Sequence, residues 1–123
     1  MKVLLVDDEP FILQGLSVLI DWAAEGCEIV KMASNGKEAL LYLEDHEADL
    51  VITDIKMPVM SGLELLEQIR GRQISDAFFI ILSGYNDFSY AQKAIRYACM
   101  DYLVKPVQKE ALLELIRKAK SSL

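Results

Sequence analysis

The fold of this chain is constrained most by a repeated alternation of short apolar runs and longer amphipathic segments. The apolar runs predict strands at 2–6, 27–33, 49–53, 77–82 and 101–104. Segments of helical period predict helices at 10–23, 36–46, 62–72, 86–98 and 108–120. Runs such as Phe79-Ile80-Ile81-Leu82 lack polar alternation, which is typical of parallel strands covered on both faces. With right-handed crossovers, five such strand–helix units predict a doubly wound α/β fold.

Several predicted helices begin at recognisable signals. Pro10 suits a first helical turn. Asn35 with Glu38 predicts a capping box, and Ser61 with Glu64 predicts a second one. These signals support the starts of three of the five helices.

Composition narrows the class of protein. The 123 residues, 53% of them apolar, predict one domain spanning 1–123. A net charge of -6 argues against nucleic acid binding by this domain, because phosphate binding needs clustered Lys and Arg. No window approaches the ~18 apolar residues of a membrane span, and the chain enters its first strand without a leader. With Cys27 and Cys99 interpreted as buried free thiols, we expect a cytoplasmic protein.

Acidic residues follow two of the predicted strands. Asp54 ends the run Leu50–Thr53, and Asp7 and Asp8 follow the run Val3–Val6. In doubly wound sheets ligands bind beyond the carboxyl ends of the strands, where Ser83 and Lys105 are also expected. Like charges gathered at one edge repel unless a cation neutralises them or their pKa values rise. The pattern therefore favours a site for a hard divalent cation.

Four motifs at the predicted strand ends identify a family. They are Leu4-Leu5-Val6-Asp7-Asp8-Glu9, Thr53-Asp54-Ile55-Lys56-Met57-Pro58 with Gly62, Leu82-Ser83-Gly84, and Asp101-Tyr102-Leu103-Val104-Lys105-Pro106. With these motifs the chain resembles the response-regulator receiver domain of two-component signalling over essentially its whole length. The resemblance implies a flavodoxin-like three-layer sandwich with the parallel sheet order 2-1-3-4-5.

The resemblance also implies the roles of the residues at the site. Asp54 matches the phosphoacceptor, which takes a phosphoryl group from a phosphohistidine of a sensor histidine kinase. Asp7, Asp8 and Asp54, with the backbone carbonyl of Lys56, match the ligands of Mg²⁺. Lys105 matches the lysine that binds a phosphoryl oxygen, and the family has a cis peptide between this lysine and the proline that follows it.

Two further matches imply a conformational switch. Ser83 matches the hydroxyl residue that moves toward the phosphate, and Tyr102 matches the aromatic residue that then turns inward. The expected result is a change in the surface formed by 86–98, 101–104 and 108–120. The same surface could support a homodimer, with Lys93, Arg96, Tyr97 and Arg117 available. Such a protein catalyses only its own phosphorylation and dephosphorylation and is not otherwise an enzyme.

Other matches point to the output and to departures from the family. The stretch Ser83–Phe88 and the pair Asp21-Trp22 resemble receivers fused to an AraC-type helix-turn-helix domain, so we expect transcriptional output from a longer protein, with a free-standing receiver as the alternative. Ala98 stands where the family usually has Gly, which predicts a different local turn. Tyr85 is predicted to screen the phosphate and slow its hydrolysis.

Three alternatives compete with this interpretation. A Mg²⁺-dependent phosphatase or phosphotransferase with an aspartyl phosphate intermediate usually carries a DxD motif after the first strand, whereas this chain has the pair Asp7-Asp8. A degenerate receiver that acts only as a binding module would not need all the site residues. A nucleotide-binding domain would need a Gly-rich phosphate loop, which the chain lacks. His46, Trp22 and Phe78-Phe79 are interpreted as surface or packing residues.

Overall fold

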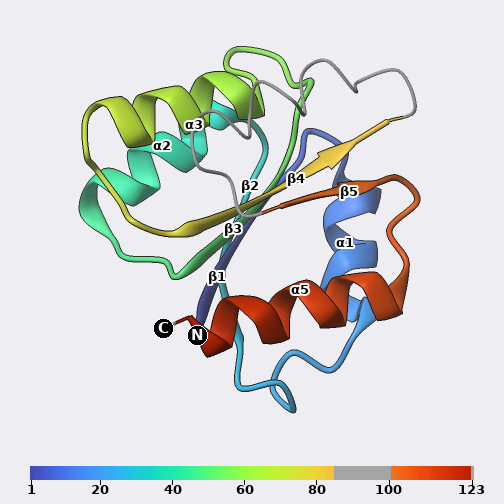
Figure 1. Ribbon diagram of the computed structural model, residues 1–123. Helices are drawn as coiled ribbons and strands as arrows, with labels where there is room; N and C mark the ends of the chain where they lie inside the picture. Colours follow the sequence, from blue (N-terminus) through green and yellow to red (C-terminus); the bar gives the residue numbers. More distant parts are fainter. Residues whose placement is uncertain (85–100, 123) are drawn as a thin grey trace.

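The computed structural model describes residues 1–84 and 101–122 and contains a five-stranded parallel sheet (Figure 1). The strands lie in the order β2-β1-β3-β4-β5, which confirms the predicted sheet order. Their bounds are β1 (Lys2–Val6), β2 (Glu28–Ala33), β3 (Leu50–Asp54), β4 (Phe78–Ser83) and β5 (Asp101–Val104). Each strand begins and ends within one residue of its predicted range.

Helices cover both faces of the sheet (Figure 1). The described helices are α1 (Pro10–Leu19), α2 (Gly36–Asp45), α3 (Gly62–Gly71) and α5 (Lys109–Ser121). The helices α1 and α5 lie on one face, and α2 and α3 lie on the other. This arrangement confirms the three-layer α/β sandwich.

Two hydrophobic cores, one on each face of the sheet, hold the layers together. Successive strand residues contribute to opposite cores, because side chains alternate across a strand. In β1, Leu4 and Val6 pack toward α2 and α3, whereas Val3 and Leu5 pack toward α1 and α5. All four side chains are fully buried, as expected for a strand in the interior of a covered sheet.

The first helix is shorter than the range 10–23 predicted from periodicity. It ends at Leu19, and Ile20 is already extended. The indole N–H of the buried Trp22 donates to the carbonyl of Leu16 at 3.0 Å, and Asp21 Oδ1 accepts the amide of Ala24 at 3.1 Å. These side chains satisfy backbone groups that a longer helix would have used, so the prediction was wrong by one turn.

Two of the three predicted helix-start signals are confirmed in full, and the third is confirmed in part. Pro10 occupies the first turn of α1, and the Ser61–Glu64 capping box is present with both of its hydrogen bonds. Asn35 accepts the amide of Glu38 at 2.9 Å, as predicted. The Glu38 carboxylate, however, accepts from the amide of Ser34 instead of Asn35, so the reciprocal half of that box was wrong.

Some predictions lie outside the described residues. They are the helix at 86–98, the dimer residues Lys93, Arg96 and Tyr97, the loop residue Tyr85, Ala98 and Cys99. Within the described ranges, Cys27 is a buried free thiol, and no helix is both long and apolar enough to cross a bilayer.

Candidate functional site

The predicted acidic residues come together where β1 and β3 end. The two strands are parallel neighbours, so their carboxyl ends lie at one edge of the sheet. Asp7 is fully buried, Asp54 is 8% exposed, and Asp8 is exposed to solvent. One carboxylate oxygen from each of the three residues lies within 4.8 Å of the others. The chain thus brings the three carboxylates of its predicted metal site into one cluster, which we call the acidic cluster.

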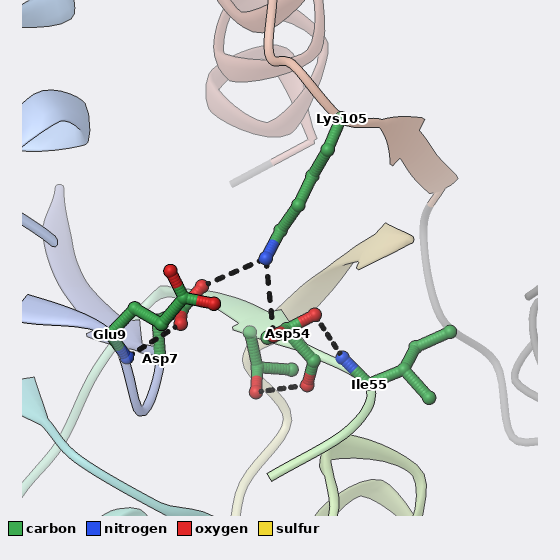
Figure 2. A network of polar contacts seen from close by, with 6 residues as sticks. Asp7, Glu9, Asp54, Ile55 and Lys105 are labelled. Carbon is green, nitrogen blue, oxygen red and sulfur yellow. Dashed lines mark hydrogen bonds and ion pairs between the residues drawn. The ribbon is translucent and has the colours of Figure 1, made fainter. Parts of the chain in front are cut away.

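Hydrogen bonds orient the two buried carboxylates (Figure 2). Asp7 Oδ1 accepts the amide of Glu9 at 3.0 Å, a local turn that aspartate favours because its side chain reaches the backbone two residues on. Asp54 Oδ1 accepts the amide of Ile55 at 2.9 Å. Each of these carboxylates therefore has one oxygen held by the backbone, and its Oδ2 remains for other contacts.

Lys105 supplies the contact to both remaining oxygens (Figure 2). It follows β5, and its peptide bond to Pro106 is cis, as the family resemblance implied. Its Nζ lies 3.2 Å from Asp7 Oδ2 and 3.1 Å from Asp54 Oδ2. The ammonium group thus links the ends of β1, β3 and β5 at a single point.

Burial and the neighbouring charges shift the pKa values of Asp54 and Lys105. Burial, and then the charge of Asp7, raise the pKa of Asp54, although the hydrogen bond and charge of Lys105 act against the rise. For Lys105, burial alone would lower the pKa. The hydrogen bond and charge of Asp54, with those of Asp7, outweigh burial and raise it. Burial and Asp7 thus disfavour the ionised form of Asp54, whereas the two carboxylates favour the charged form of Lys105.

The predicted switch residues lie on the adjoining strands. Ser83 is the last residue of β4, is buried, and accepts the amide of Lys105 through its carbonyl at 2.8 Å. Tyr102 is a half-buried residue of β5, pairs with Ile81, and packs against the core beneath α2 and α3. Lys56 follows Asp54 by two residues and is exposed. Ser83 and Lys56 therefore lie near the carboxyl ends of β4 and β3, and Tyr102 lies two residues before the end of β5.

An apolar groove runs beside the site, and sequence reasoning missed it. Its volume is about 450 Å³, and its lining residues are Phe11, Ile12, Gly15, Leu16, Leu19, Lys105, Pro106 and Val107. Phe11 is 82% exposed, although it directly follows the proline that begins α1. The available sequence signal was that Phe11, a large apolar residue, lies off the face of the helix that carries Leu13 and Leu16.

The acidic cluster has the chemistry of a divalent cation site. Carboxylate oxygens are the ligands that Mg²⁺ and Ca²⁺ prefer. When ionised, three carboxylates and the Lys105 ammonium leave a net charge of minus two, which one divalent cation would neutralise. The cluster could therefore hold a metal ion.

Comparison with known proteins gives the family. The profile of the response regulator receiver domain matches residues 3–117. The chain is 38% identical over 117 residues to the uncharacterized transcriptional regulatory protein YesN of Bacillus subtilis (strain 168), covering 95% of this chain and 32% of that protein. It is 42% identical over 115 residues to the transcriptional regulatory protein HptR of Staphylococcus aureus (strain N315), covering 94% of this chain and 44% of that protein. It thus spans less than half the length of these curated relatives.

Solved structures agree with this match. The receiver domain of AraT, a response regulator from Geobacillus stearothermophilus, superposes with a TM-score of 0.90 at 40% identity and covers 98% of this chain and 93% of that one. A two-component transcriptional regulator AraC from Clostridium phytofermentans ISDg superposes with a TM-score of 0.88 at 29% identity, covering 98% and 93%. The fold and the sequence therefore point to the same family.

Proposed function

Because the chain belongs to the response regulator receiver domain family, whose members are phosphorylation-dependent signalling switches, we propose that Asp54 is the residue that accepts the phosphoryl group. The observation that carries this assignment is the position of Asp54 Oδ2. It lies 3.1 Å from Lys105 Nζ and within the acidic cluster, so a phosphoryl group on it would meet a cation at once.

The transfer follows from this geometry. A carboxylate oxygen of Asp54 attacks the phosphorus of a phosphohistidine on a sensor histidine kinase, and the phosphorus–nitrogen bond breaks with its electron pair staying on the imidazole. The Lys105 ammonium holds an oxygen of the transferred group, for which a compact point charge suffices.

We propose Mg²⁺ as the cation of the acidic cluster, held by Asp7, Asp8 and Asp54 and by the backbone carbonyl of Lys56. A Mg²⁺ ion held there would neutralise charge that develops on the transferring phosphoryl group. The residues of the chain then have separate tasks. Asp7, whose Oδ1 accepts the Glu9 amide, would supply a ligand on the buried side of the cluster, and the exposed Asp8 would supply one on its solvent side.

The proposed response to phosphorylation involves Ser83 and Tyr102. Ser83 ends β4, next to β3, and Tyr102 lies on the neighbouring β5. A shift of Ser83 toward the phosphate would let the half-buried Tyr102 turn inward and change the surface of β5 and α5. Packed interiors favour two discrete arrangements over a gradual one, so a small shift is amplified. A homodimer through this surface is part of the same proposal.

The kinase would contact the apolar groove. Lys105, whose Nζ contacts Asp54, is one of the residues that line this groove, so an amphipathic helix seated there would bring its phosphohistidine close to the acceptor. The exposed Phe11 offers the apolar contact, and Lys105 offers the charge that complements the phosphoryl group.

We propose that the signal is passed on to a DNA-binding output domain in the cytoplasm, since the relatives are longer transcriptional regulatory proteins.

Labelling by acetyl phosphate tests the assignment of Asp54. The wild-type protein in Mg²⁺ is expected to take up one phosphoryl group per chain, and the label should be lost on treatment with hydroxylamine, which cleaves acyl phosphates. Asp54→Asn keeps the shape of the side chain but lacks a nucleophilic carboxylate, so it should remain unlabelled. The matched control is Asp45→Asn at the end of α2. Continued labelling of Asp54→Asn would refute the assignment.

A further inference from the structure

The loop that joins Asp54 to α3 contains an unusual backbone turn. Val59 has a φ of 70°, and the amide of Met60 donates to the carbonyl of Pro58 at 2.7 Å. A hydrogen bond across three residues with a central φ near +75° defines the strained form of the γ-turn. A β-branched residue such as valine rarely adopts this conformation. Local preference therefore works against this turn, and something else must hold it.

The Val59 side chain is not what holds the turn. It is 79% exposed, so it gains little by packing within the domain. Backbone contacts fix the loop at its two ends, and the partly buried side chains of Met57 and Met60 pack against the core beneath α2 and α3. The amide of Gly36, the first residue of α2, donates to the carbonyl of Met60 at 3.0 Å, and the amide of Gly62 donates to that of Ile55 at 2.8 Å.

Both contacts are so close that only glycine fits. A Cβ on Gly36 would lie 2.6 Å from the carbonyl oxygen of Met60 and 2.8 Å from its Cγ, so the loop would have to move. A Cβ on Gly62 would overlap the carbonyl oxygen of Asp54 itself. Gly62 therefore contacts the backbone of the proposed acceptor directly. Gly36, at the start of α2, instead contacts Met60 in the loop that follows the acceptor.

We propose that Gly36 is a positioning residue for phosphoryl acceptance: by holding the Met60 carbonyl it imposes the left-handed turn at Val59 and so sets the path of the loop that carries Lys56. This inference rests on the proposed function, in which the Lys56 carbonyl is a ligand of Mg²⁺. It adds that the start of α2 controls the geometry of this ligand. Gly36 itself contacts neither the ion nor the phosphoryl group in this proposal and acts only through the path of the loop.

The physical reason is the geometric demand of the ion. Mg²⁺ requires near-ideal octahedral coordination with short ligand distances, so a displacement of one ligand by a few tenths of an ångström weakens binding. Residues that orient metal ligands typically change affinity by about 10- to 100-fold when replaced. A loop pushed away from α2 should show a loss of this size, while the hydrophobic cores of the sheet remain packed.

Calorimetric titration with MgCl₂ tests the inference. Gly36→Ala is expected to raise the Kd for Mg²⁺ by about 10-fold or more. In the metal-free protein, the amides of Gly62 and of residue 36 should exchange their hydrogens faster. The matched control is Gly71→Ala at the end of α3, where an added Cβ meets nothing within 4 Å. The control should bind Mg²⁺ as the wild type does.

A second pair of variants separates backbone geometry from a general loss of folding. Val59→Gly keeps access to a positive φ and removes only an exposed side chain, so its Mg²⁺ affinity should stay within about twofold of the wild type. Val59→Pro cannot adopt this φ, because its ring locks φ near -65°, and it should weaken Mg²⁺ binding as Gly36→Ala does.

The outcomes are distinguishable. Wild-type affinity in folded Gly36→Ala, or in Val59→Pro if Gly36→Ala does not fold, would overturn the positioning role and leave the proposed function intact. Equal losses in Val59→Gly and Val59→Pro would overturn it as well, because the side chain would then matter. A wild-type protein that binds no Mg²⁺ and takes no label would refute the proposed function together with this inference.

Discussion

Replacing Lys105 by methionine tests whether its ammonium is the cation that allows Asp7 and Asp54 to be buried together. Methionine keeps much of the length and apolar stem of lysine and removes the charge. Nζ lies 3.1 Å from Asp54 Oδ2 and 3.2 Å from Asp7 Oδ2, while the two carboxylates approach within 4.8 Å of each other. The variant therefore leaves two buried negative charges facing each other without a counter-ion.

The magnitude follows from these distances. At an effective dielectric constant of about 20, charges 3.1 Å apart attract by roughly 5 kcal/mol, and like charges at most 4.8 Å apart repel by at least roughly 3.5 kcal/mol. The Lys105 side chain is 24% exposed, and desolvation offsets much of the attraction. We expect Lys105→Met to lower the free energy of unfolding by about 2 kcal/mol, between the values for exposed and for buried pairs. For 123 residues this corresponds to a fall in Tm of about 8 °C.

The assay is a double-mutant cycle measured by urea unfolding in EDTA. The fluorescence of Trp22, the only tryptophan, reports unfolding because its indole is buried in the fold. Lys105→Met, Asp54→Asn and the double variant are compared with the wild type. Once Asp54 is neutral, removing Lys105 should cost about 1 kcal/mol less than it does in the wild-type background. Lys109→Met, an exposed lysine at the start of α5, is the matched control.

The raised pKa of Asp54 also predicts how the destabilisation by Lys105→Met changes with pH. The pKa of Asp54 is raised in the fold, so the folded protein holds this proton more tightly than the unfolded chain does. Its contribution to stability is therefore greatest below the ordinary value of 3.8 and is lost as pH rises through the raised value. Lys105→Met removes two influences that lower this pKa, so the loss should extend to higher pH. The destabilisation should shrink as the pH is lowered from 7 toward 4.

Two results would refute this reasoning. A coupling energy below about 0.5 kcal/mol would mean that the Lys105–Asp54 contact behaves as a solvated surface pair. A destabilisation that is the same at pH 4 and pH 7 would mean that Lys105 acts through packing of its stem rather than through its charge.

Two further predictions use other parts of the structure. Phe11→Ala should slow phosphotransfer from the cognate kinase by about 10-fold while leaving acetyl phosphate labelling and stability unchanged, because its side chain is exposed in the groove. The control is Val18→Ala, since Val18 is exposed on the same helix but does not line the groove. A parallel loss of acetyl phosphate labelling in Phe11→Ala would contradict the docking role. Ser61→Ala removes the N-cap of α3 and should lower the free energy of unfolding, measured in urea, by about 1 kcal/mol. The control is Ser121→Ala at the end of α5, and equal stability of the two variants would mean that the capping box contributes nothing.

Much of the fold was predictable because its signals are local. Short apolar runs located all five strands to within a residue, and the Ser61–Glu64 pair located the start of α3. Prediction failed where a side chain made a contact that periodicity does not record. The turn of Trp22 back onto the carbonyl of Leu16 shortened α1, and the reach of Glu38 to Ser34 replaced half of a capping box.

The acidic cluster was predictable from sequence for a similar reason. Parallel strands end at the same edge, so carboxylates placed after β1 and β3 must meet once the sheet order is known. The residue types and their place along the chain therefore determined that Asp7, Asp8 and Asp54 gather, and the motifs around them determined the family. The lysine after β5 was identified in the same way.

Only the tertiary structure decided how these groups face one another. Lys105 and Asp7 are 98 residues apart, and the bridge between them depends on strand register and on the path of two loops. The contact of Gly36 with Met60, and the turn it imposes on Val59, likewise join segments whose approach no local pattern records. A sequence specifies which groups reach an edge of a sheet, because periodicity and strand order are properties of the chain. Distances of a few ångströms arise only when the layers pack and their backbones are pressed together.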